Sequence, residues 1–108
     1  MNVMLYDDKQ GHDARLDSVE FDAEKRMASV HLLAYPETDA PQRVPITILF
    51  EGVLSLALNA DLTSLANNRS AGNVNHWHMA EGGGTSHIYL IEGHIAISSQ
   101  SAPQLVLR

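Results

Sequence analysis

The 108-residue sequence contains no cysteine. This absence excludes disulfide bonds, zinc–thiolate centres and cysteine nucleophiles. A chain of this length buries roughly two-thirds of the surface that its unfolded form exposes, so it can build a core without such cross-links. We expect one domain, residues 1–108, in a reducing compartment such as the cytoplasm.

Basic side chains are scarce: Lys and Arg number 7, Asp and Glu 13, and the net charge is −6. Because proteins contact phosphate backbones through Lys and Arg, nucleic-acid binding is disfavoured. The negative charge is concentrated in residues 1–24, which carry seven acidic and two basic side chains. This segment would suit a basic protein partner, with Asp13, Asp17 and Glu20 as contact residues. The alternative is a solvated surface that only favours solubility.

Long apolar runs are also absent. The longest, VPITILF and VLSLALNA, are far too short to cross a bilayer. The first ten residues lack the basic start and apolar stretch of a signal peptide. We therefore expect no contact with a membrane.

Familiar catalytic motifs are missing as well. There is no Gly-x-Ser-x-Gly elbow, and GGGTS at 82–86 lacks the lysine of a phosphate-binding loop. His12 and Asp13 are neighbours and such a pair can transfer protons, but adjacent side chains usually point in different directions. An aspartate at this position more commonly bonds nearby backbone amides in a turn. We predict no catalytic residue and a non-enzymatic protein.

Short apolar segments separated by turn-forming stretches dominate what is present. Proline, glycine and small polar residues mark loops at 36–45, 67–73, 81–84 and 99–103. The segments between the turns predict strands at about 15–22, 26–35, 44–51, 53–59, 74–80, 86–91, 94–99 and 104–108. One short helix is predicted at about 60–68, with Asn59 or Asp61 as its cap.

This spacing predicts a mainly β fold, an antiparallel β-sandwich or open barrel of about 7–8 strands with one short helix. An edge strand such as 104–108 could pair between two copies in a homodimer.

The segment SHIYLIEGHIAIS predicts a hairpin whose turn is Glu92–Gly93, with glycine supplying a positive φ. In that register Tyr89 pairs with Ala96. Ile88, Leu90, Ile95 and Ile97 then share the core face. His87, Tyr89 and His94 point away from it.

The loop EGGG at 81–84 decides how the strand NHWHM lies against this hairpin. An even loop length places His78 opposite His87 and His76 opposite Tyr89, with Trp77 on the core side. An odd length reverses every side chain. Burying Trp77 recovers a few kcal/mol, whereas burying two unpartnered imidazoles costs free energy, so we expect the even length.

The expected register gathers His76, His78 and His87 on the outer face of a sheet. Cross-strand neighbours lie about 5 Å apart, and neutral imidazole is a common ligand of transition metals. A divalent metal site formed by these three histidines is one interpretation. The other is an ordinary solvated sheet face without a cofactor.

The stretches HDARLDSVEFD (12–22), AEKRMASVHL (23–32) and ITILFEGVLSLAL (46–58) resemble a class of small bacterial domains of unknown function. Those domains begin with His-Asp-Ala-x-Leu and carry Phe-x-Gly-Val between two strands. The residues that match are His12, Asp13, Leu16, Phe50, Gly52 and Val53. Some members are grouped with the immunity proteins of bacterial toxin systems. The resemblance covers the first half of the chain and implies a β-rich accessory protein that binds another protein.

Overall fold

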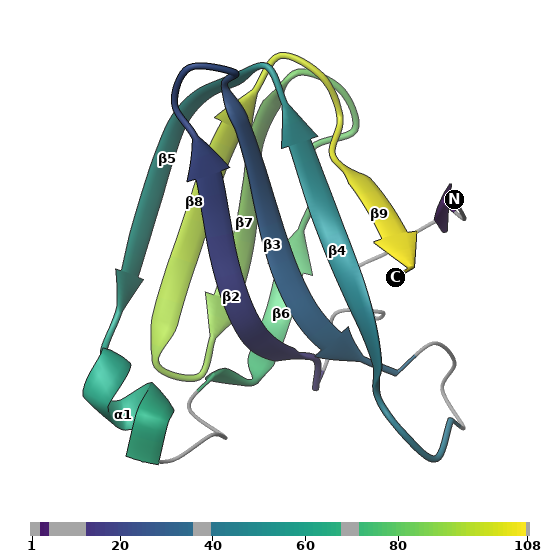
Figure 1. Ribbon diagram of the computed structural model, residues 1–108, viewed down its shortest axis with the longest axis vertical. Coiled ribbons are helices and arrows are strands. Elements are labelled where there is room, and N and C mark those ends of the chain that lie inside the picture. Colours follow the sequence, from purple (N-terminus) through teal and green to yellow (C-terminus); the bar gives the residue numbers. More distant parts are fainter. Residues whose placement is uncertain (1–2, 5–12, 36–39, 68–71, 108) are drawn as a thin grey trace.

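The structure, a computed structural model, is a sandwich of two antiparallel β-sheets (Figure 1). It describes residues 3–4, 13–35, 40–67 and 72–107. Sheet A has the strand order β1 (Val3–Met4), β9 (Gln104–Leu107), β4 (Val44–Glu51), β3 (Met27–Ala34) and β2 (Arg15–Asp22). Sheet B has the order β5 (Val53–Ala60), β8 (Gly93–Ser99), β7 (Gly84–Leu90) and β6 (Val74–His78).

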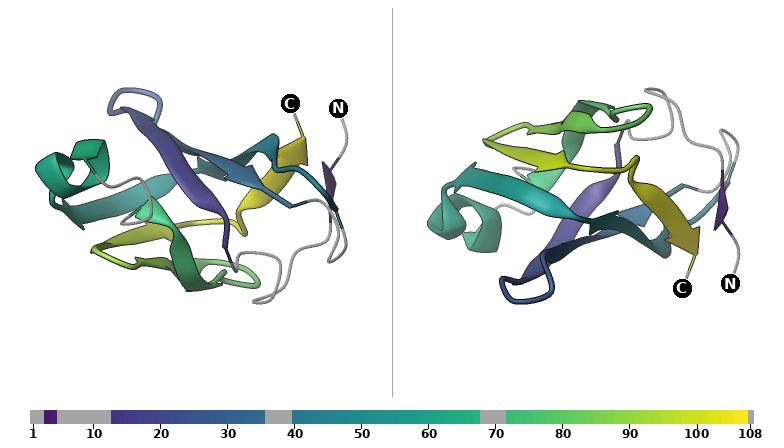
Figure 2. Two further views of the ribbon diagram at one scale, coloured as in Figure 1. Left: turned by 90° about the horizontal axis from the view of Figure 1, so that it is seen from below. Right: turned by 90° about the horizontal axis from the view of Figure 1, so that it is seen from above.

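The predicted mainly β fold is confirmed. The two sheets stay separate layers and do not close into a barrel, as the end-on views show (Figure 2). The short helix α1 (Leu62–Asn67) follows β5 and lies within the predicted range. In the described part of the chain, no helix has the length and apolar character needed to span a membrane.

The core lies between the sheets because apolar residues alternate along the strands. In β3 every second side chain is buried: Ala28, Val30, Leu32 and Ala34. Sheet B contributes Ile88, Leu90, Ile95 and Ile97 from the β7–β8 hairpin. Trp77 is the largest fully buried side chain. The inner faces predicted for β6, β7 and β8 are confirmed.

The register of β6 against β7 is the predicted one. His76 pairs with Tyr89, Trp77 with Ile88, and His78 with His87. The connection covers residues 79–83 instead of the expected 81–84, because β6 ends at His78 and β7 begins at Gly84. The buried hydroxyl of Ser86 accepts a hydrogen bond from the N–H of Ala80 at 3.0 Å, which closes the loop without a ladder pair.

The predicted register of the β7–β8 hairpin is wrong by two residues. Leu90 pairs with Gly93 and Tyr89 with His94, so the turn consists of Ile91 and Glu92. The N–H of Ile91 donates to the carbonyl of Asn73 at 2.9 Å, which ties the turn to the start of β6. A shift of two preserves which face each side chain occupies. It moves His94 next to Tyr89.

Two further expectations at the sheet edges are corrected. Residues 104–107 lie between β1 and β4, so this strand is not an edge. The alternation of leucines in 53–59 predicts an apolar face formed by Leu54, Leu56 and Leu58, and this face is only partly covered: Leu54 is 63% and Leu58 46% exposed. The irregular pairing between Val53 and Ser55 breaks the alternation at the start of β5. Because β5 is the last strand of sheet B, its inner face extends beyond the opposing core.

Candidate binding edge and histidine face

The last strand of sheet A, β2, has one edge that pairs with no other strand of the described chain apart from a single bridge between Arg15 and Asn73. Pairing with β3 places Val19 opposite Val30 and Phe21 opposite Ala28, so both side chains point inward. Phe21 is nevertheless 66% exposed, because the sandwich is open on this side.

The acidic residues predicted to bind a partner lie along or just before this edge. Asp13 is exposed in the turn before β2 at φ 64°, and its N–H donates to the carbonyl of Val74 at 3.1 Å. Asp17 is exposed at an irregularity in the β2–β3 pairing. Glu20 pairs with Ser29 in β3 and is also exposed. His12 lies outside the described residues, so the His12–Asp13 pair stays untested.

Glu20 already has a partner within sheet A. Its Oε1 lies 3.0 Å from Nε2 of His31, and Nδ1 of His31 lies 2.9 Å from the hydroxyl oxygen of Thr47. The Glu20 side chain remains 75% exposed, so its carboxylate can still contact another molecule. The alternation in 26–35 predicts that His31 is a packing or half-buried residue, and it is half-buried.

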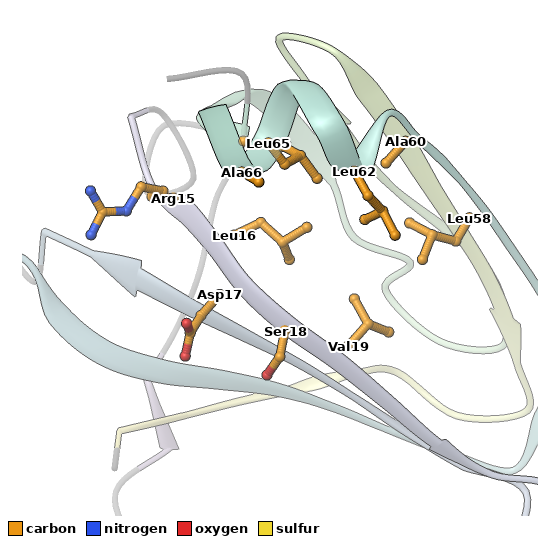
Figure 3. Close-up of a pocket in the computed structure, with 11 residues that line it drawn as sticks. Arg15, Leu16, Asp17, Ser18, Val19, Leu58, Ala60, Leu62, Leu65 and Ala66 are labelled. Carbon is orange, nitrogen blue, oxygen red and sulfur yellow. The ribbon is translucent and has the colours of Figure 1, made fainter. Parts of the chain in front are cut away.

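A groove of about 470 Å³ lies beside β2 (Figure 3). Three elements supply its apolar walls, with side chains that point toward one another: Leu16 and Val19 of β2, Leu58 of β5, and Leu62 and Leu65 of α1. The carboxylate of Asp17 points away from the groove. Leu62 of α1 is 73% exposed, so this wall of the groove is accessible to solvent. The edge strand β2 has an apolar side toward the groove and an acidic side toward solvent.

The outer face of sheet B carries the second candidate site. Tyr89 stacks between His76 and His94, with ring centroids 4.4 and 4.7 Å away. His87 lies against the same group, 5.7 Å from the Tyr89 ring and 5.2 Å from the His94 ring. Nδ1 of His87 and Nε2 of His94 are 3.0 Å apart, a hydrogen bond in which either nitrogen can donate. These four rings are called the ring cluster below.

The three histidines predicted to hold a metal share this face but differ in their contacts. His78 is the cross-strand partner of His87, whereas His76 stacks on Tyr89. Among the residues that the structure describes, no group of three or more His, Asp or Glu side chains could hold a metal ion. The imidazole nitrogens that form a hydrogen bond on this face are those of His87 and His94.

Two features of these surfaces cannot be predicted from the sequence alone. The close approach of His94 depends on a turn placed one residue earlier than glycine suggests, which shifts the pairing register by two residues. The groove depends on β2 and α1 lining one cavity, although its residues Val19 and Leu62 are 43 positions apart in the sequence. The apolar spacing of Leu58, Leu62 and Leu65 was the available signal, since it continues from the strand into the helix.

The chain matches no protein-family model, no curated protein and no solved structure. The resemblance to the His-Asp-Ala-x-Leu domains therefore stays a prediction, and the function rests on the two surfaces described above.

Proposed function

We propose that the protein is a non-enzymatic binding module that takes up an extended, basic segment of another protein along β2. The observation that carries this proposal is the free edge of β2, which has an acidic side and lies beside an apolar groove. An edge strand offers unpaired N–H and C=O groups, and adding a partner strand to such an edge is a common mode of peptide recognition.

The two faces of β2 define the chemistry of the partner. A segment paired with β2 would turn alternate side chains inward, over Val19 and Phe21 and into the groove. Its other side chains would lie beside Glu20 and Asp22, where Lys or Arg meets opposite charge. The preferred ligand is therefore a strand in which apolar and basic residues alternate.

The resemblance to immunity-like domains supports a narrower version of the proposal. In that version the basic segment belongs to a bacterial toxin, and binding at β2 would block it. A pull-down with the product of a neighbouring toxin gene tests this version. Capture that disappears when Asp17 and Glu20 are neutralised supports it, and salt-insensitive capture contradicts it.

The general proposal is tested with a synthetic peptide of alternating lysine and valine, titrated into isotope-labelled protein. We expect chemical-shift changes at the amides of β2 and at the groove methyls, and affinity that falls with added salt. Glu20→Gln and Asp22→Asn should each weaken binding by about two- to fivefold, the size of an exposed charge interaction.

Two controls distinguish binding at this site from nonspecific binding. A peptide of alternating glutamate and valine should not bind, since it repels the acidic edge. Leu62→Ser should weaken binding, whereas Ile91→Ser should not, because Ile91 is similarly exposed, at 59%, but lies in the β7–β8 turn. Equal binding of both peptides, or equal loss in both variants, would overturn the proposal.

A further inference from the structure

The ring cluster lies on sheet B, whereas the proposed protein-binding edge, β2, belongs to sheet A. His87 and Tyr89 come from β7, His94 from β8 and His76 from β6. The rings of His87 and His94 are within 7° of parallel. Their facing nitrogens are held 3.0 Å apart by one shared proton. Imidazole nitrogens so placed offer a lone pair each once that proton moves to the distal nitrogen.

The spacing of these nitrogens is close to that of two ligands on one metal ion. Zn–N bonds of about 2.0–2.1 Å at a tetrahedral angle place two nitrogens roughly 3.3 Å apart. Replacing the shared proton by an ion thus requires ring rotation and a separation only a few tenths of an ångström larger. Neutral imidazole suits Zn²⁺, Ni²⁺ and Cu²⁺.

The neighbouring rings hold the two ligands in position. Tyr89 stacks on His94 and contacts the His87 ring, and His76 stacks on the other side of Tyr89. Such support reduces the rotamer entropy that the two histidines would lose on binding. The cross-strand partner of His87 in β8 is Ala96, whose side chain is short.

We propose that His87 and His94 form a two-histidine site for a divalent transition-metal ion, with water completing the coordination. The described residues supply no third ligand, so the ion keeps open positions and exchanges readily. This pair replaces the set His76, His78 and His87 that the sequence alone suggests. Cu²⁺ should bind more tightly than Ni²⁺ or Zn²⁺, following the general order of divalent affinities.

The test is calorimetric titration of the untagged protein with Cu²⁺, Ni²⁺ and Zn²⁺. We expect one ion per chain, and at least tenfold weaker binding in His87→Ala and in His94→Ala. The electron paramagnetic resonance of bound Cu²⁺ should report two imidazole nitrogens in the parent protein and fewer in either variant.

His78→Ala is the matched control, because His78 pairs with His87 across the strands but has no part in the proposed site. It should change the affinity less than twofold. Trp77 fluorescence confirms that each variant is folded, and His94→Asn provides a polar replacement should His94→Ala unfold. Loss of affinity in His78→Ala with His94→Ala unchanged would overturn the proposal, as would the absence of binding at millimolar metal.

Discussion

At the scale of single residues, Gly93 shows that a glycine beside a turn can be required for the space it leaves and not for its backbone conformation. The sequence suggests that it supplies a positive φ, but the residue pairs with Leu90 inside the ladder. What requires glycine there is space. A Cβ at Gly93 would lie 3.0 Å from the carbonyl oxygen of Asn59 and 3.2 Å from Cβ of Ala60. Strand β5 therefore packs closely against the start of β8.

Gly93→Ala should lower the free energy of unfolding by about 1–3 kcal/mol, the usual cost of an overpacked site. The nearest atom belongs to the backbone of β5, which cannot rotate away. Chemical denaturation measures this change. Gly82→Ala is the control, because nothing lies within 4 Å of its Cβ position. It should leave stability unchanged or raise it by up to about 1 kcal/mol. Equal effects at both glycines would contradict the packing argument.

At the scale of elements, the helix α1 depends on an N-cap, for which the sequence offers two candidates, Asn59 and Asp61. Asp61 is the one used: its Oδ1 accepts hydrogen bonds from the N–H groups of Ser64 at 3.2 Å and Thr63 at 3.0 Å. The bonds to Ser64, and then that to Thr63, hold the pKa of Asp61 below its ordinary value of 3.8. A six-residue helix has little stability of its own, so the cap matters.

The pH dependence of α1 follows from this shift. The folded state favours ionised Asp61, so the cap stabilises α1 above the ordinary carboxyl pKa and is lost as the pH falls through the lowered one. Amide hydrogen exchange in residues 62–67 should accelerate at acid pH relative to β3. Asp61→Asn, which caps without titrating, should flatten this dependence, and Asp61→Ala should speed exchange at every pH. An acid response that persists in Asp61→Asn would assign it to another group.

Strand patterns predict sheet faces better than they predict register. The burial of Trp77 selects the correct face for β6, because the wrong face would expose it and bury His76 and His78. No such cost separates two hairpin registers that differ by two residues, since both keep Ile88 and Ile95 inside. The bond from Ile91 to Asn73 that selects the true register joins distant residues. That is why the contact between His87 and His94 is not evident from the sequence.

At the scale of the whole molecule, composition and alternation predict a β-sandwich, but not the order of its strands. Strand order decides which surfaces are free. The strand expected at an edge, of which 104–107 are described, lies between two strands, and among the described residues the larger strands with a free edge are β2, β5 and β6. The acidic residues of β2 discourage unspecific pairing there. The proposed binding edge thus depends on topology, while its charge is evident in the sequence.

The edge of β5 differs from that of β2, and the difference predicts how the whole molecule associates. Its eight residues, Val53–Ala60, include no charged side chain, and Leu54 and Leu58 are exposed. A long apolar edge without charges favours pairing with another copy.

We expect concentration-dependent self-association through β5, measured by sedimentation velocity over a wide range of protein concentration. Ala57→Lys should abolish it by placing like charges opposite each other across the new strand pair. Ile91→Lys changes the net charge equally but lies in a turn, so it should leave association intact. A protein that stays monomeric throughout, or that responds equally to both substitutions, would show that β5 does not pair and that the homodimer expected from the sequence needs another edge.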